Sequence, residues 1–457
     1  MKKAIYVFTL LALFGLSNST HAQSLAGGRA FSLAVCDNNA VRAWGYNING
    51  QLGNGTYTDS NVPVSVNSLT GIIAVACGDR HSLALKNNGT VWAWGSNDSG
   101  VLGNGTNVTS SNVPVAVSLL TNIKAIAGGR YHSLALGMDS TVWAWGFNGE
   151  GALGNGTNTN SNVPVHLTSL HGIIAIAAGT NFSLALSKDG IVWTWGINDD
   201  GELGNGTNTG STIPIPLTSL TGIKAIAGGY FHALALQNNG TVWAWGYNNS
   251  GQLGNGSNTD SNVPVHLTSL TDIGSIAAGK SHSLARANDG TVWDWGGNSY
   301  GQLGNGTGTA SSVPVHLTSL TGITAIASGE SHSLALKDDG TARAWGSNSN
   351  GELGNGANAN SNVPVEVSGL CPVLALNEIA EQLSVSVYPN PGTGLFTVTL
   401  SSDKGTIEIF TLYGDKVYQA EINNQKSFID LSNQPKGIYF VTFRSGQKTQ
   451  TSKILLQ

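Results

Sequence analysis

Histidine is the residue of this sequence whose spacing first suggests chemistry, because imidazole nitrogens can ligate a metal ion or transfer a proton near neutral pH. Residues about 50 positions apart form no local ligand cluster, however, and Phe31 and Phe182 take the same position in two further copies of the pattern. We therefore expect the five recurrent His to be packing residues: His81, His132, His232, His282 and His332. Three further His, each following Val-Pro-Val, receive the same interpretation: His166, His266 and His316.

Carboxylates gather at one place, Asp199, Asp200 and Glu202. A hydrolase or lyase acting on a polysaccharide would need carboxylates that converge on the substrate, or a His cluster. Residues 187–193, Ser-Lys-Asp-Gly-Ile-Val-Trp, nearly match the Ser-x-Asp-x-Gly-x-Thr-Trp box of sialidases but are one residue short, and such boxes are structural. We predict that the chain is not an enzyme, with no catalytic residue, cofactor or metal ligand; the polysaccharide enzyme stays as an alternative.

These residues belong to a unit that recurs seven times. A Trp-Gly pair recurs every 50 or 51 residues, each is followed by Leu-Gly-Asn-Gly, and a Pro closes each unit. The Trp residues are Trp44, Trp94, Trp145, Trp195, Trp245, Trp295 and Trp345.

Each unit contains four short apolar runs separated by Gly, too short for helices of ordinary length. In residues 222–270 we name them strands A (IKAIA), B (HALAL), C (TVWAWG) and D (around VPVHL). An Asn-Gly pair between B and C is typical of a tight hairpin. Seven such units predict an all-β fold, a seven-bladed β-propeller over residues 23–376.

The motif GGYFHALAL…GTVWAWGYNNSGQLGNG resembles the regulator of chromosome condensation repeat family, which forms seven-bladed propellers. That family includes guanine-nucleotide exchange factors, an ultraviolet photoreceptor and a secreted inhibitor of β-lactamase. The exchange factor uses a wedge inserted into a blade, whereas no unit here exceeds its neighbours by more than one residue. The photoreceptor uses Gly-Trp-Arg-His-Thr, and the Trp is absent from every matching loop. Exchange-factor-like activity stays as an alternative by family name only.

The first 22 residues read as a signal peptide cut before Gln23: Lys2 and Lys3, an apolar segment, then Thr-His-Ala. The segment is shorter than a membrane span, so we expect no membrane span anywhere in the chain. The net charge is −5, and the sequence has no Lys/Arg cluster, which argues against a nucleic-acid partner. We expect a protein that is secreted or displayed on the outer cell surface via the periplasm.

After a linker at residues 377–383 the composition changes. Residues 384–457 contain Tyr-Pro-Asn-Pro at 388–391 and Gly-Ile-Tyr-Phe at 437–440, and they resemble the C-terminal sorting domain (type A) of type IX secretion cargo. The resemblance implies an immunoglobulin-like β-sandwich and a partner in the type IX secretion machinery.

Strand A of the first unit looks truncated at Ser24, while residues 370–376 resemble a strand A. We expect this C-terminal stretch to pair into the first blade and close the ring. In that register Cys36 and Cys371 lie opposite each other, which suggests a disulfide in an oxidising compartment; three unrelated small residues, Cys77 included, are the alternative.

The loops between strands A and B and between C and D emerge at the same end of each blade and differ from unit to unit, whereas the B–C turns are uniform. Aromatic anchors among charges are typical of a recognition surface. We therefore predict a noncatalytic, monomeric binding scaffold whose partner is an extracellular protein or glycan. The candidate residues are Tyr230, Phe231 and Tyr247 first, Tyr131 and Phe147 next, then Tyr46, Tyr300, Arg130, Asp199 and Asp200.

Overall fold

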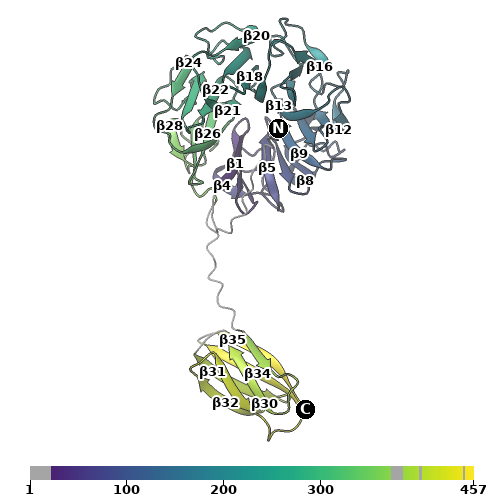
Figure 1. Cartoon of the computed structure of the whole chain (residues 1–457), viewed down its shortest axis with the longest axis vertical. Helices are drawn as coiled ribbons and strands as arrows, with labels where there is room; N and C mark the ends of the chain where they lie inside the picture. Colours follow the sequence, from purple (N-terminus) through teal and green to yellow (C-terminus); the bar gives the residue numbers. More distant parts are fainter. Residues whose placement is uncertain (1–21, 372–383, 401–403, 446–447) are drawn as a thin grey trace, which may run out of the picture. The chain divides into compact units, whose positions relative to one another are not determined.

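A computed structural model describes residues 22–371, 384–400, 404–445 and 448–457, and divides the chain into two compact units, Met1–Pro372 and Val373–Gln457. The expected linker and nearly all of the expected signal peptide lie outside the described residues. In unit 1, seven four-stranded antiparallel sheets surround a central axis (Figure 1), which is the predicted propeller.

Each blade runs from an inner strand A to an outer strand D. Blades 1 to 3 are β1 (Ala22–Gly27), β2 (Phe31–Cys36), β3 (Val41–Gly45), β4 (Ser60–Ser65); β5 (Ile72–Cys77), β6 (His81–Lys86), β7 (Val91–Ser96), β8 (Ser110–Ala116), with the 3₁₀ turn η1 (Asp98–Gly100); β9 (Ile123–Gly128), β10 (His132–Gly137), β11 (Val142–Gly146), β12 (Ser161–His166). Blades 4 and 5 are β13 (Ile173–Ala178), β14 (Phe182–Ser187), β15 (Val192–Gly196), β16 (Ser211–Leu217); β17 (Ile223–Gly228), β18 (His232–Gln237), β19 (Val242–Gly246), β20 (Ser261–His266). Blades 6 and 7 are β21 (Ile273–Ala278), β22 (His282–Ala287), β23 (Val292–Gly296), β24 (Ser311–His316); β25 (Ile323–Ser328), β26 (His332–Lys337), β27 (Ala342–Gly346), β28 (Ser361–Glu366).

The second Trp of strand C ties each blade to the preceding one. Trp94 is fully buried, and its indole N–H donates to the backbone oxygen of Gln51 at 2.8 Å. Gly53 has φ +65° and leaves room for this ring, since a Cβ there would lie 2.7 Å from the indole nitrogen. The same bond, at 2.7–2.8 Å, joins six of the seven interfaces. In the remaining interface Trp345 donates instead to the buried carboxyl group of Asp294 at 3.3 Å.

The His at the start of strand B is the second tie between blades. His132 Nε2 lies 2.8 Å from Ser183 Oγ of the next blade, and that hydroxyl donates onward to a backbone oxygen, so the imidazole donates. The five recurrent His are buried and make this bond at 2.8–3.0 Å. They are packing residues, as expected.

One interface carries a matched replacement of both partners. Phe182 replaces His in blade 4, and Ala233 replaces Ser at the facing position of blade 5; both lie in one buried apolar cluster. Losing both polar partners leaves no buried group unpaired, which makes the double exchange far less costly than either single one.

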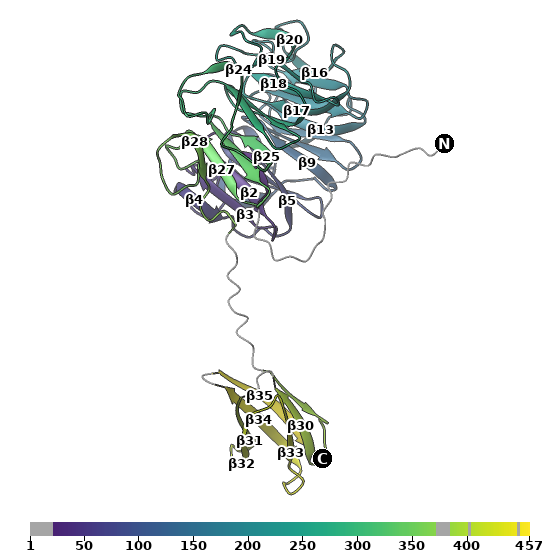
Figure 2. The same cartoon turned by 60° about the vertical axis from the view of Figure 1, so that its left-hand side comes forward.

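The ring closes through the N-terminal side of the chain, so the expectation that residues 370–376 supply the missing strand is wrong. β1 takes that position and pairs with β2 from Ala22↔Cys36 to Gly27↔Ser32. Figure 2 shows the purple strands of blade 1 beside the green strands of blade 7. The error arose because Ala22 and Gln23 were assigned to the leader and its cleavage site. Four registered pairs, from Ser24↔Val35 onward, remain after a cut before Gln23.

The end of blade 7 is nevertheless fastened to blade 1. A disulfide joins Cys36 and Cys371, whose Cα atoms are 5.7 Å apart, across a sequence separation of 335 residues. The Cys36 sulfur also lies 3.7 Å from the carbonyl oxygen of Leu370. Cys77 is a free cysteine.

The second unit is a β-sandwich. One sheet contains β29 (Val385–Tyr388), β30 (Leu395–Leu400) and β33 (Lys426–Asp430); the other contains β31 (Gly405–Thr411), β32 (Lys416–Ile422), β34 (Gly437–Ser445) and β35 (Lys448–Leu456). Their facing sides share an apolar core that includes Phe396, Val398, Ile409 and Phe443.

Replacing His232 by Phe and Ser283 by Ala should make the propeller less sensitive to acid. Burial lowers the pKa of His232 to about 3, whereas an unfolded imidazole titrates near 6.5. The stability that the neutral ring provides is therefore complete above pH 6.5 and lost as the pH falls toward 3. Between pH 6 and 4, the unfolding free energy of the double variant, measured by denaturant titration, should fall about 1.4 kcal/mol per pH unit less steeply than that of the parent.

The interface between blades 4 and 5 supplies the matched control. Phe182→His together with Ala233→Ser should steepen the same pH dependence by a similar amount. Identical slopes for the parent and both double variants would contradict this account of the interface.

Replacing Cys36 and Cys371 by Ser should lower the unfolding free energy by roughly 2 to 5 kcal/mol, because the cross-link no longer restricts the unfolded chain. The loop-entropy model sets an upper estimate of about 5 to 6 kcal/mol for a loop of this length. Cys77→Ser serves as the control. Reduction should add about 2 Da to the intact mass of the parent, and detection of three free thiols in the native protein would contradict the cross-link.

Candidate binding site at the mouth of the central channel

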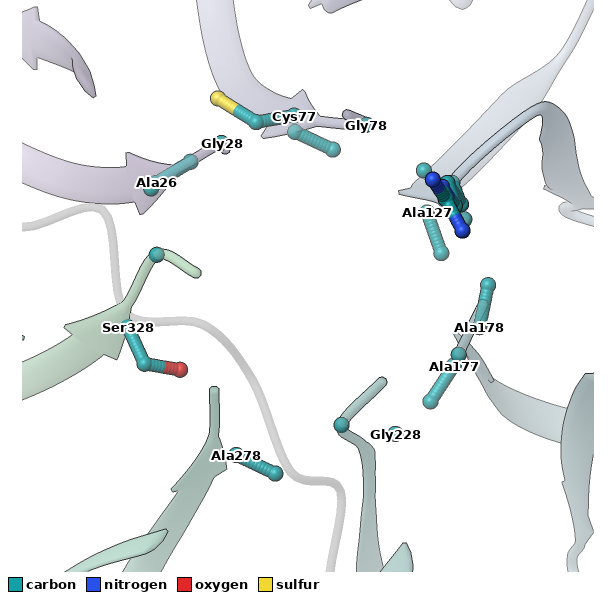
Figure 3. A pocket seen from close by; sticks show the side chains of 18 of the residues that line it. Ala26, Gly28, Cys77, Gly78, Ala127, Ala177, Ala178, Gly228, Ala278 and Ser328 are labelled. Carbon is teal, nitrogen blue, oxygen red and sulfur yellow. The ribbon is translucent and has the colours of Figure 1, made fainter. Parts of the chain in front are cut away.

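The seven inner strands end around a cavity of about 280 Å³ on the propeller axis. Figure 3 shows small side chains around this opening, among them Ala127, Ala177, Ala278 and Ser328. Small residues are needed because seven strand ends meet at the axis, where larger side chains would collide. Cys77, at the end of β5, belongs to the same wall, and burial raises the pKa of its thiol well above the usual value.

Charged side chains from the A–B loops meet at the mouth of this cavity. Arg29 Nε of blade 1 lies 3.2 Å from Glu330 of blade 7, and Arg29 Nη1 lies 3.9 Å from Asp79 of blade 2. Arg80 Nε lies 3.5 Å from Asp79, and Lys280 Nζ lies 2.7 Å from Glu330. Three of these ion pairs join different blades, across blades 6, 7, 1 and 2, and the fourth lies within blade 2.

Tyr230 of blade 5 reaches across the mouth to the opposite blades. Its hydroxyl donates to Asp79 Oδ1 at 2.7 Å and lies 3.4 Å from Glu330 Oε2. Burial, followed by the two nearby carboxylates, raises the pKa of Tyr230 above its usual value, so it stays a hydrogen-bond donor. Tyr230 is half-buried, and its hydroxyl is hydrogen-bonded across the mouth. It therefore stabilises the mouth, a role that we call the Tyr230 brace, and it also belongs to the predicted binding face.

The aromatic residues chosen from the sequence form two clusters beside the mouth. In blade 5, the rings of Tyr230 and Phe231 pack edge-to-face at 6.2 Å, as do those of Phe231 and Tyr247 at 6.1 Å. In blade 3, Tyr131 and Phe147 pack in the same way at 6.3 Å. These separations are typical of favourable aromatic pairs. The rings of both clusters are half-buried and lie on the A–B and C–D loop face.

Arg130, also predicted, belongs to both the mouth and the blade 3 cluster. Its guanidinium carbon lies 4.8 Å from the centre of the Tyr131 ring, a cation–π distance. Arg130 also lines the cavity.

The remaining predicted residues lie apart from these clusters. Tyr46 holds the position in blade 1 that Tyr247 holds in blade 5, but its A–B neighbour is Ala30, which offers no ring to pack against. Tyr300 is 50% exposed in the C–D loop of blade 6. Asp199 is exposed and Asp200 half-buried in the corresponding loop of blade 4.

Glu202, in the loop with Asp199 and Asp200, is a buried carboxyl. Its Oε2 accepts the backbone N–H of Asp200 at 3.0 Å, and burial raises its pKa to about 7. Gln252 and Gln302 make the equivalent backbone contact in later blades. Glu202 therefore fills a structural position, which weakens the case for an acidic catalytic loop.

The sequence shows Arg29, Asp79, Lys280 and Glu330 only as variable loop residues, and their convergence was missed. Each lies about 50 residues from the next such loop, so only closure of the ring brings them together. One signal could have revealed this convergence. Each of the four residues directly follows the Gly at the end of strand A, and this end of the strand lies closest to the propeller axis.

One cluster has the residue types of a hydrolase triad. Ser333 Oγ lies 3.0 Å from His282 Nε2 and 3.4 Å from Asp294 Oδ2. All three side chains are fully buried between blades 6 and 7, and Asp294 contacts the Ser rather than orienting the His. This geometry differs from that of a nucleophilic triad. Within the described residues, no group of three His, Cys, Asp or Glu could hold a metal ion, and no helix could cross a membrane.

Known proteins share these features. A family model for the RCC1-like domain matches residues 64–387, and one for the regulator of chromosome condensation (RCC1) repeat matches residues 39–85. A model for the secretion system C-terminal sorting domain matches residues 386–457.

Two curated proteins are similar over part of the chain. The Ultraviolet-B receptor UVR8 of Arabidopsis thaliana is 33% identical over 136 residues, 29% of this chain and 31% of that protein. The probable E3 ubiquitin-protein ligase HERC6 of Homo sapiens is 36% identical over 135 residues, 29% of this chain and 13% of that protein. The chain thus spans less than a third of either relative.

Two solved structures share the fold. Human WBSCR16 is 25% identical with a TM-score of 0.66, covering 72% of this chain and 94% of that one. Prp20p from Saccharomyces cerevisiae, studied for its binding to Gsp1p and histones, is 25% identical with a TM-score of 0.66, covering 80% of this chain and 90% of that one. Because the RCC1-like model covers most of the chain and the sorting-domain model covers its end, this protein belongs to the RCC1-like propeller family and is exported to the cell surface or secreted by the type IX system.

Proposed function

We propose that the propeller is an exported, noncatalytic recognition module that binds an extracellular protein or glycan through its A–B and C–D loop face. The observation that carries this proposal is the blade 5 cluster, where half-buried aromatic rings adjoin the charged channel mouth. Aromatic residues and Arg are the types that dominate the binding energy of protein interfaces.

The contrast between the two ends of the propeller supports this choice. The loop face differs in every blade, from Arg29 in blade 1 to Glu330 in blade 7, whereas the B–C turns at the other end repeat a polar hairpin. A rigid frame that varies only at one end is suited to recognition, since loop side chains can change without disturbing the blade interfaces.

Two of the similar proteins are described by what they sense or bind, which supports a binding role. UVR8 is named as a receptor, and the Prp20p study concerns binding to Gsp1p and histones. Because the sorting domain exports this chain, the partner that we propose is a molecule outside the cell or on its surface.

Phe231→Ala combined with Tyr247→Ala should abolish capture of the partner, because it removes two anchors of the face but leaves the Tyr230 brace. The bait is the full chain from residue 23, incubated with culture fluid and surface extracts and analysed by mass spectrometry. We expect at least tenfold less bound partner with the double variant.

Met138→Ala is the matched control, since Met138 is 65% exposed at a B–C turn. It should capture as much partner as the parent. Equal capture by the parent and the loop-face variant, at equal thermal stability, would contradict the proposal. If the parent captures nothing above background, the recognition role is wrong.

A further inference from the structure

We infer that the channel mouth is a carboxylate-binding subsite, anchored by Arg130, that receives an acidic side chain of a protein ligand. The inference deepens the proposed function and rests on it for the identity of the ligand as a protein. The subsite itself rests on the charges, contacts and cavity of the mouth.

Among the described residues, Arg130 is the cation of the mouth for which no carboxylate lies within 4 Å. Arg29, Arg80 and Lys280 each lie within 4 Å of Asp79 or Glu330. For Arg130, by contrast, the described residues provide only the Tyr131 ring at 4.8 Å, and its buried Nε, like that of Arg80, has no hydrogen-bond partner. A guanidinium with a desolvated, unpaired N–H is prepared to bind an acceptor, and a carboxylate offers two oxygens in the matching geometry.

The charge of the mouth favours an anion. Four cations, Arg29, Arg80, Arg130 and Lys280, surround two carboxylates, Asp79 and Glu330, a formal balance of +2 within a chain whose net charge is −5. Both carboxylates also accept or approach the Tyr230 hydroxyl. They are thus already compensated, whereas an incoming anion would meet a locally positive opening.

The shape of the cavity favours a single side chain. About 280 Å³ lies just below the range of pockets that enclose drug-sized ligands, which begins near 300 Å³. The wall of the cavity is mostly Gly, Ala, Ile and Val, with Cys77 and Ser328, and the apolar majority suits the aliphatic stem of an acidic residue better than the hydroxyls of a sugar.

The surroundings favour a protein over a glycan as the source of that side chain. Tyr131 and Phe147 on one side, and Phe231 and Tyr247 on the other, pack edge-to-face among themselves. Rings packed in this way show a ligand their edges and only part of their faces. Such surfaces suit the apolar side chains that would flank an acidic residue in a protein ligand. A central charge contact flanked by aromatic anchors is the arrangement found in protein interfaces.

The subsite can be tested without knowing the ligand by using a matched pair of probes. N-acetyl-glutamate amide carries the carboxylate, and N-acetyl-glutamine amide has the same shape without the charge. The full chain from residue 23 is titrated with each probe by isothermal titration calorimetry, and in the parent the Arg130 Nε–Hε resonance is also followed by NMR. We expect saturable shifts with the glutamate probe and at least tenfold weaker binding of the glutamine probe.

Arg130→Gln should weaken binding of the glutamate probe at least tenfold, and Arg130→Lys should weaken it less, since charge without the bidentate fork remains. Arg343→Gln, which removes an Arg on β27 that is paired with Glu366, is the control and should bind the probe as the parent does. No saturable binding to the parent, or equal binding by Arg130→Gln with unchanged thermal stability, would overturn the inference.

Capture of the partner separates this inference from the proposed function. If Arg130→Gln captures the partner as well as the parent does, while the Phe231→Ala/Tyr247→Ala variant loses it, the recognition role stands and the acidic-residue subsite is wrong. If the parent captures no partner but binds the glutamate probe in an Arg130-dependent manner, the carboxylate subsite stands and the protein-recognition role is wrong.

Discussion

The hydrogen bond from a buried strand C indole to a backbone oxygen of the preceding blade is the interaction on which the rest of this structure depends. It recurs at 2.7–2.8 Å in six interfaces and holds each C–D loop against the next blade. Because each blade packs its core on its two neighbours, and only loop side chains such as Tyr230 reach farther, stability is close to a sum of these interfaces. A local bond between adjacent blades, repeated around the axis, therefore fixes a global geometry.

That geometry gives the loop face its properties. The Trp and His ties lie inside the blade interfaces, so the residues that follow strand A are free to differ. The ring then brings residues from different blades to one axis, where Tyr230 can reach Asp79 and Glu330. Side chains far apart in sequence thus form a single charged and aromatic surface that no isolated blade could provide.

Much of the fold could be predicted from the sequence because its signals are periodic. The spacing of Trp-Gly and Leu-Gly-Asn-Gly gave the number of blades, and the replacement of His by Phe showed that this position is buried. The origin of the first inner strand was mispredicted, because strand A is short, faces the channel with small residues and here adjoins the leader. A pattern of four residues, Ser-Leu-Ala-Gly, was too weak a signal to compete with the cleavage motif beside it.

The candidate site was predicted only in part, because the sequence shows which loop residues vary but not which of them meet in the closed ring. Tyr230, Phe231 and Tyr247 could be chosen because aromatic side chains in variable loops are conspicuous. The contact between Arg29 and Glu330 could not be predicted from the sequence, because it depends on the ring closing between blades 7 and 1. The brace made by Tyr230 depends likewise on which blades face each other across the axis, a property of the closed ring rather than of any repeat.

The central claim is that the loop face of an exported propeller contacts another extracellular molecule, and photo-cross-linking on intact cells tests it most directly. Benzoylphenylalanine would replace Tyr247 on the loop face, or Met138 at the opposite end. The account predicts a light-dependent covalent adduct with one exported or surface protein from position 247 and none from position 138. No adduct from position 247, or the same adducts from both positions, would contradict it.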